Sequence, residues 1–326
     1  MMPKFSWKSV SFIFFVFTCL VSCGKADKLE AEISKVNTDI ELERFDSLFA
    51  AVTPQGLSDI KAKYPFMFSD KYPDAFWLDK KEDTLQIQLF NEVSKTFDDS
   101  VGLERELEDL FNHLTYYFHE FNPPRIITVT NDVDYRNRVI VTDTIAVIAL
   151  DTYLGSEHEF YGAIPKYIRA ALTKEQIVVD IATEYGEKYI FQPQRKTLLD
   201  EMIYFGKLLY FKDLIIPFKS EAERIGYTAS ELDWARANEE YIWRFFVERE
   251  LLYSNDVKLP RRFINPAPFS KFYLEDIDAE SPGRIGQYMG WQIVRAFMNN
   301  NEVSLKEMLT ADTQEIFNKS KFKPRK

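Results

Sequence analysis

The stretch RIITVTNDVDYRNRVIVTDTIAVIAL, residues 125–150, decides the fold. β-Branched residues gather there in three runs, 126–130, 138–141 and 144–150, and short groups of Asn, Asp and Arg separate the runs. β-Branched side chains favour strands, and the polar groups between them favour turns. The stretch therefore predicts a small β-sheet with a hairpin around Asp143.

Helical periodicity precedes this predicted sheet. Apolar residues recur every three or four positions in 57–68, 84–97 and 103–121, which is the spacing of an amphipathic helix. Pro123-Pro124 should end the third helix, because proline has no N–H for the helical hydrogen-bond ladder.

Helix-start signals follow the predicted sheet. Thr173, Thr228 and Ser304 each stand three residues before a Glu or Gln, the spacing of a capping box. Ser281-Pro282 predicts a further start, with proline at the first helical position. We therefore predict an α+β fold, a mostly helical single domain with a small sheet in its first half.

The N-terminal sequence has the pattern of an export signal. Lys4 and Lys8 precede an apolar run, residues 10–21, and Ser22-Cys23 follows it. This pattern predicts a lipoprotein signal peptide, with Cys23 acylated by chains such as palmitate. The alternative is a single transmembrane anchor, but the run is short of the ~20 apolar residues that span a bilayer.

The signal divides the chain into three predicted parts. Residues 1–22 are the signal peptide, residues 23–37 a lipid-anchored tether, and residues 38–326 one domain. Leu29 and Ile33 have helical spacing within the tether. No linker or repeat divides the third part. The predicted location is the cell envelope, facing the periplasm, with the choice of inner or outer membrane open.

Charge and cysteine content exclude several classes of function. The net charge is −10, which argues against a nucleic-acid partner. Of two cysteines, Cys19 lies in the predicted signal peptide and Cys23 is the predicted anchor. No thiol then remains for a disulfide, a metal site or a nucleophile.

Sequence motifs give no catalytic centre. No HExxH, P-loop, GxSxG or dinucleotide-binding pattern occurs. His113 and His119 stand six residues apart on one predicted helix, so they face different directions and make a poor metal pair. His158 has no second histidine at helical spacing. We expect no cofactor and no metal.

Three glycines recur at helical spacing near the C-terminal end. Gly283, Gly286 and Gly290 follow Pro282, and glycine inside a helix costs about 1 kcal/mol relative to alanine. Such a cost indicates either close packing of another backbone or a ligand near the helix N-terminus. The stripe-like spacing favours close packing, which makes these structural glycines.

Four segments resemble the gliding motility lipoprotein B (GldB) family of the Bacteroidetes. They are NEEYIWRFFVERELLYSND (238–256), RFINPAPFSKFYLEDIDAESPGRIGQYMGWQIVRAFM (262–298), DIELERFDSLF (39–49) and TIAVIALDTYLG (144–155). The resemblance implies a lipid-anchored envelope protein required for gliding, a motility linked to type IX secretion. It also implies other gliding-machinery proteins as partners, besides the membrane that Cys23 binds.

A second, distant similarity is to zinc peptidases with an HExxH helix, which implies a degenerate, zincin-like fold. Asp180 stands at the position of the first histidine, Ile181 at that of the general base and Glu184 at that of the second histidine. Phe205 stands at the position of the glutamate ligand. Isoleucine takes no proton and phenylalanine binds no zinc, so this similarity implies a pseudoenzyme.

Three functions follow as hypotheses. The first is a non-catalytic envelope lipoprotein, a structural or assembly component of the gliding and type IX secretion apparatus. The second is a metal-dependent hydrolase with an atypical site, in which Asp180 and Glu184 hold a hard cation, although such a pair is more often simply solvated. The third is a glycan-binding lipoprotein, suggested by the 15% aromatic content.

Overall fold

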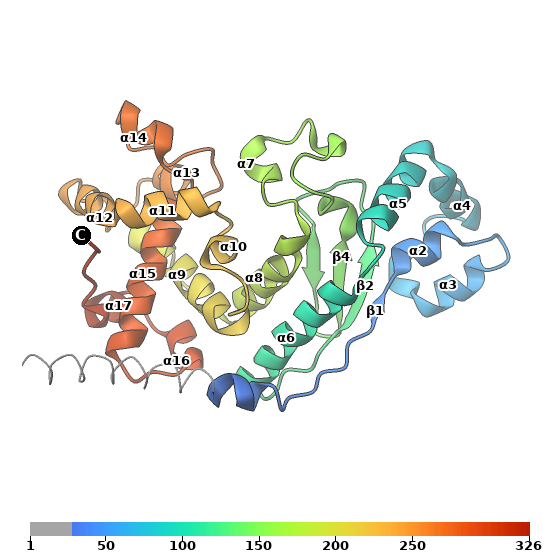
Figure 1. Ribbon diagram of the computed structural model, residues 1–326, viewed down its shortest axis with the longest axis horizontal. Coiled ribbons are helices and arrows are strands. Elements are labelled where there is room, and N and C mark those ends of the chain that lie inside the picture. The colour runs from blue at the N-terminus through green and yellow to red at the C-terminus, as the bar shows by residue number, and fades with distance from the viewer. Residues whose placement is uncertain (1–27) are drawn as a thin grey trace, which may run out of the picture.

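A four-stranded sheet lies in the first half of the chain, and the computed structural model describes residues 28–326 (Figure 1). Its order is β1-β2-β4-β3, with β2 parallel to both β1 and β4 and β3 antiparallel to β4. The strands are β1 (Leu42–Glu43), β2 (Arg125–Val129), β3 (Val139–Val141) and β4 (Ile145–Ala149).

The predicted hairpin is confirmed. Val141 pairs with Ala146, so residues 142–144 form the turn around Asp143. Within that turn the Thr142 backbone N–H donates to the Ile145 carbonyl oxygen over 2.8 Å. The sequence did not predict β1, because a strand of two residues shows no run of β-branched side chains.

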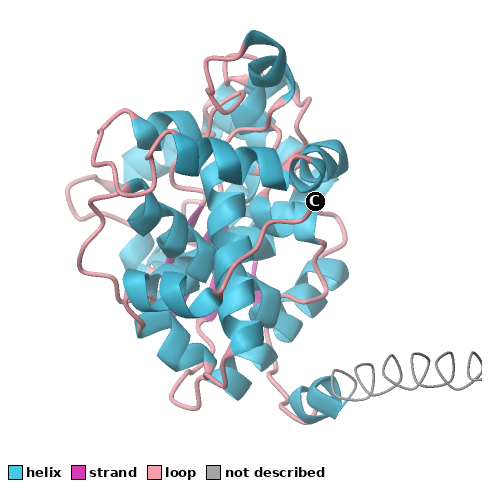
Figure 2. Cartoon of the chain, turned by 90° about the vertical axis from the view of Figure 1, so that its left-hand side faces the viewer, coloured by secondary structure: helices cyan, strands magenta, loops and turns pink. Residues whose placement is uncertain are grey.

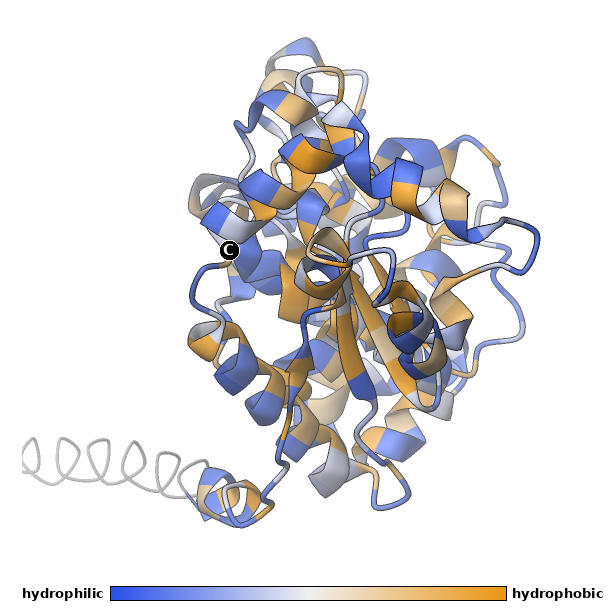
Figure 3. Ribbon diagram, turned by 90° about the vertical axis from the view of Figure 1, so that its right-hand side faces the viewer, coloured by the Kyte–Doolittle hydropathy of each residue, from blue (hydrophilic) through white to orange (hydrophobic). Residues whose placement is uncertain are grey.

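The central strands β2 and β4 are covered on both faces. Ile126 and Ile148 point into a large core that extends to the C-terminal helices, whereas Ile127 points into a smaller core on the other face. Strands covered on both faces contain near-continuous apolar runs, which explains the composition of residues 144–150. Figure 3 shows these strands as largely hydrophobic ribbons among helices with mixed faces.

Five α-helices lie between β1 and β2. They are α2 (Phe45–Ala50), α3 (Leu57–Lys63), α4 (Asp74–Glu82), α5 (Thr84–Thr96) and α6 (Val101–Tyr117), with a 3-10 turn, η1 (Pro65–Met67). The first four surround the smaller core, whereas α6 packs in the large one. The helix predicted over 57–68 is interrupted, because Pro65 disfavours helical geometry at Tyr64 (φ −128°, ψ 58°).

The rest of the chain after β4 is helical. Its α-helices are α7 (Lys166–Arg169), α8 (Ile177–Tyr189), α9 (Leu198–Ile215), α10 (Glu221–Ile225), α11 (Ala229–Ala237), α12 (Glu239–Glu248), α13 (Leu259–Phe263), α14 (Glu275–Glu280), α15 (Ile285–Asn300), α16 (Leu305–Thr310) and α17 (Thr313–Ser320). Three 3-10 turns accompany them: η2 (Leu150–Thr152), η3 (Glu159–Tyr161) and η4 (Lys174–Gln176). Figure 2 views the face that these helices cover, with the strands behind them. The predicted α+β class is confirmed.

Two of the predicted capping boxes are confirmed, at Thr228 and Ser304. Thr173 instead precedes the 3-10 turn η4 and makes no side-chain capping bond. The start predicted at Ser281-Pro282 was also wrong. There α15 begins at Ile285, because Arg284 takes a left-handed conformation (φ 61°, ψ 25°) that breaks the helix before it.

Helices α9 and α15 cross at the centre of the C-terminal half. Gly206 of α9 meets Gly290 of α15, where a Cβ on Gly206 would lie 2.3 Å from the Gly290 carbonyl oxygen. Trp291 on the same stretch of α15 is completely buried. The two helices therefore touch backbone to backbone, which only glycine allows at these positions.

The described part of the predicted tether is attached to the domain. Residues 28–33 form a short helix, and Ile33 is buried. The Thr38 backbone N–H donates to Asn112 Oδ1 over 3.1 Å, which ties the following segment to α6. The predicted signal peptide, residues 1–22, and the predicted anchor Cys23 lie outside the described residues.

Candidate functional site

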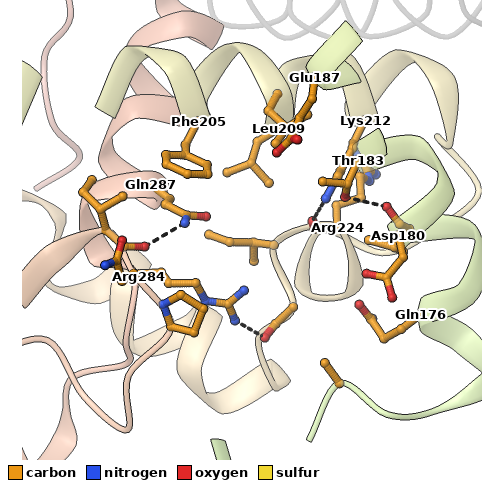
Figure 4. Close-up of a pocket in the computed structure, with 18 of the residues that line it drawn as sticks. Gln176, Asp180, Thr183, Glu187, Phe205, Leu209, Lys212, Arg224, Arg284 and Gln287 are labelled. Atoms are coloured by element: carbon orange, nitrogen blue, oxygen red, sulfur yellow. Dashed lines mark hydrogen bonds between the residues drawn. The ribbon is translucent and has the colours of Figure 1, made fainter. Parts of the chain in front are cut away.

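A cavity of about 240 Å³ lies between α8, α9 and the start of α15 (Figure 4). The end of α10 and residues 264–266 after α13 complete its walls. Its charged and polar lining residues are Arg138, Gln176, Asp180, Thr183, Glu187, Lys212, Arg224, Asn265, Arg284 and Gln287. Cationic side chains outnumber acidic ones in this lining, which gives the cavity a basic character.

The cavity contains only part of the predicted degenerate site. Asp180 on α8 and Phe205 on α9 line it together, although 25 positions separate them in the sequence. Ile181 is instead completely buried in the large core, and Glu184 is absent from the cavity lining. The structure therefore does not bring Asp180 and Glu184 together as two ligands of one cavity.

Asp180 is held by two donors. The Tyr153 hydroxyl donates to Asp180 Oδ2 over 2.7 Å, and the Arg138 guanidinium donates to Oδ1 over 3.1 Å. Burial raises the pKa of Asp180, and the positive charge of Arg138 opposes that rise. Both carboxylate oxygens thus have partners within the fold.

Lys212 is a buried cation of the cavity wall. Its side chain is 7% exposed, and Nζ donates to the Arg224 carbonyl oxygen over 3.2 Å. Burial lowers the pKa of Lys212 to about 8, and nearby Arg284 adds to that effect while Asp180 opposes it.

Arg284 is a second cation of the cavity, placed by the left-handed turn before α15. Its Nη2 donates to the Gly226 carbonyl oxygen over 2.5 Å, and its guanidinium lies 5.4 Å from the centre of the Tyr227 ring. Gly226 is also left-handed (φ 70°), and a Cβ there would stand 3.1 Å from Arg284 Nη1. Burial lowers the pKa of Arg284.

The cations of the cavity differ in their counter-ions. Arg138 pairs with Asp180, and Arg224 pairs with Asp213 at the edge of the wall. Among the residues that the structure describes, no carboxylate lies within ion-pair distance of Lys212 or Arg284. Both groups donate instead to backbone carbonyl oxygens.

The sequence matches the family described as Gliding motility protein GldB over residues 26–324. The chain belongs to this family. The predicted GldB resemblance is thus confirmed, and membership makes the chain a gliding-motility lipoprotein associated with the cell envelope. Searches of curated proteins and of solved structures return no match. Within residues 28–326, no helix has the length and apolar character needed to cross a bilayer.

The histidines of this GldB-family chain lie apart. His113 is buried on α6, and its Nδ1 lies 2.7 Å from the Asp109 carbonyl oxygen. His119 is exposed beyond the end of α6, and His158 contacts Glu92 at 3.3 Å. Over residues 28–326, no three His, Cys, Asp or Glu side chains gather closely enough to hold a metal ion.

The three structural glycines all face neighbouring backbone. A Cβ on Gly283 would lie 2.3 Å from the Ala267 carbonyl oxygen, and one on Gly286 would lie 2.9 Å from that of Phe263. Gly290 faces the backbone of α9. None of the three lines the cavity.

Sequence reasoning missed Lys212 and Arg284. A signal for Lys212 was present, because Lys207, Lys212 and Asp213 are the charged residues of the largely apolar stretch MIYFGKLLYFKDLII, residues 202–216. A charged residue on a helix that is buried on most sides needs a polar partner. Arg284 had no comparable signal, because its side chain reaches the cavity through a left-handed turn that no sequence motif predicts.

Proposed function

We propose that this chain is a non-catalytic lipoprotein of the cell envelope that serves gliding by contact with other proteins. Acylated Cys23 would hold it in the membrane, with residues 38–326 facing the periplasm. Its role would be that of a structural or assembly component of the gliding and type IX secretion apparatus. Family membership supports the link to gliding.

The chemistry of the cavity supports the absence of catalysis. HExxH places its two ligands and its base at positions i, i+4 and i+1 of one helix. The residues of α8 that line the cavity with this spacing are Val179, Asp180 and Thr183, one position earlier than the alignment made from sequence. In the cavity register, Val179 stands at the first ligand position and binds no zinc. In the register aligned from sequence, Ile181 stands at the position of the base and takes no proton. Phe205 binds no zinc in either, so neither register supplies a peptidase centre.

One observation favours the second candidate, an atypical hydrolase. Lys212 and Asp180 have pKa values shifted toward each other in one cavity, and such shifts are common at catalytic sites. Peptidase and esterase assays on Lys212→Met and Asp180→Asn distinguish this alternative. An activity that wild type shows and both variants lose would establish the hydrolase.

One observation also favours glycan binding. A groove of about 410 Å³ runs along α11, α12 and α14, and Trp234, Tyr241 and Phe245 contribute aromatic side chains to it. Tyr241 is 60% exposed, which suits stacking against a sugar ring. Calorimetry with envelope polysaccharides tests this alternative, and an absence of heat would eliminate it.

The proposed function has a direct genetic test. Deletion of the gene in its native host should abolish spreading on agar and the secretion of type IX substrates. Cross-linking of the acylated protein in envelope membranes should then capture components of the apparatus. A deletion strain that glides and secretes normally would contradict the proposal.

A further inference from the structure

Lys212 and Arg284 have unused hydrogen-bond donors at the cavity. A lysine ammonium offers three N–H groups and an arginine guanidinium five. Each side chain has one hydrogen-bond acceptor among the described residues, the Arg224 carbonyl oxygen for Lys212 and the Gly226 carbonyl oxygen for Arg284. Figure 4 shows the two cations entering the same cavity from α9 and from the turn before α15.

The remaining charges of the cavity do not neutralise these two cations. Asp180 is engaged by Arg138 and Tyr153, and exposed Glu187 is the other acidic residue of the lining. Removing a cation from water without a counter-ion is costly, and the positive charges of Lys212 and Arg284 also repel each other. An anion bound between them would relieve both costs.

Apolar side chains form the adjoining wall. Phe205 and Leu209 extend from α9 into the cavity (Figure 4). Ile264, just after α13, also lines it. A ligand with one charged end and a short apolar body would match this division. The volume of about 240 Å³ exceeds the ~150 Å³ cavity that holds benzene and falls below the ~300 Å³ of the smallest drug-sized sites.

We propose that this cavity binds a small carboxylate with a short apolar group. Arg284 and Lys212 would receive the carboxylate, and the apolar part would rest against Phe205, Leu209 and Ile264. The planar fork of an arginine matches the two oxygens of a carboxylate. One negative charge suits the site better than two, because Glu187 already offsets part of the positive charge. This inference stands apart from the role in gliding.

Binding can be measured on the full chain purified in detergent. N-acetyl-L-leucine is the probe, followed by NMR or calorimetry, and N-acetyl-L-leucine amide is its uncharged control. We expect the carboxylate to bind at least about tenfold more tightly than the amide, the value of one charge-assisted hydrogen bond. Equal binding of the two compounds, or no binding of either, would overturn the proposal. Inorganic phosphate binding in place of the carboxylate would also overturn it.

Variants connect the binding to the two cations. Arg284→Gln and Lys212→Met should each weaken binding by about tenfold or more. Arg261→Gln, at an exposed arginine outside the cavity, should leave binding unchanged. Wild-type affinity in both cavity variants would contradict the proposal.

Stability separates a binding role from a structural one. Lys212→Met removes a buried cation that has no carboxylate partner, so its thermal midpoint should equal or exceed that of wild type. A folded variant of undiminished stability that no longer binds N-acetyl-L-leucine supports the site. A variant that loses stability but keeps wild-type affinity would show that Lys212 serves the fold alone.

Discussion

Gly290 brings the backbone of α15 onto that of α9 at Met202. A Cβ built on Gly290 would lie 1.7 Å from the Met202 carbonyl oxygen, well inside any allowed contact. Because the obstacle is backbone, no side-chain rotation can relieve the overlap. This crossing sets the positions of Phe205, Lys212 and Arg284, which belong to or adjoin these two helices.

The contact predicts a large effect of one methyl group. Gly290→Ala should lower the free energy of unfolding by at least about 3 kcal/mol, since the two helices must separate to admit the Cβ. Urea unfolding followed by circular dichroism measures this change. Gly102→Ala is the matched control, because Gly102 lies in α6 and the added Cβ would meet no atom within 4 Å apart from its chain neighbours and the backbone of its own helix. That control should be neutral or stabilise by up to about 1 kcal/mol, and equal effects of the two substitutions would contradict the packing.

Asp151 predicts a dependence of stability on acidic pH. Its completely buried carboxylate accepts the N–H groups of Asn131 and Val133, and burial raises its pKa to about 6. Between the unfolded value, about 4, and 6, the folded state holds more protons than the unfolded state, so stability falls as pH rises through this window. Asp151→Asn should flatten this slope in urea unfolding at pH 4 to 6.5.

The control for Asp151 is the fully exposed Asp143. Asp143→Asn should retain the wild-type slope over the same window. Parallel slopes for wild type and Asp151→Asn would show that Asp151 does not titrate there.

The buried Lys207 should make stability rise with pH in the alkaline range, which is opposite in sign to the effect of Asp151. Its completely buried ammonium donates to the Leu309 and Ala311 carbonyl oxygens, and burial lowers its pKa to about 8. Above pH 8 the unfolded state keeps a proton that the folded state has lost, so this group favours folding increasingly up to about pH 10. The difference in stability between wild type and Lys207→Met should therefore change between pH 7.5 and 9.5. A constant difference would contradict this assignment.

Cys23 predicts the location of the protein. Cys23→Ser should release the chain from the membrane pellet into the soluble fraction, because serine could not carry the acyl chains that we propose for Cys23. Fractionation and immunoblotting measure this change, and the same strain should fail to glide. A Cys23→Ser strain that glides normally would show that the tether is dispensable.

The sheet and the longer helices could be predicted because local signals agree with the fold there. The β-branched runs of 126–130 and 144–150 became strands, and the apolar spacing of 84–97 became α5. The start of α15 could not be predicted. The signal at Ser281-Pro282 was local. The left-handed turn at Arg284 instead comes with tertiary contacts, since Arg284 donates to the Gly226 carbonyl oxygen and Gly283 packs against the backbone of Ala267.

The candidate site was predicted in part, for a geometric reason. Alignment by residue type placed Asp180 and Phe205, which meet in the cavity, but it also named Ile181 and Glu184, which do not line it. Successive residues of a helix point about 100° apart. An alignment that is wrong by one residue therefore names side chains that face the core in place of side chains that face the cavity. Lys212 and Arg284 come together only through the crossing of α9 and α15.

Motility of an Asp180→Asn strain distinguishes a domain that acts by contact, as we propose, from one that acts by catalysis. The substitution keeps the shape of the side chain that Arg138 and Tyr153 hold but removes its capacity to transfer a proton. Expressed in a deletion strain beside Asp143→Asn, the variant should restore wild-type colony spreading. An Asp180→Asn protein that reaches the membrane at normal abundance, yet leaves the cells unable to glide while Asp143→Asn restores them, would contradict the account.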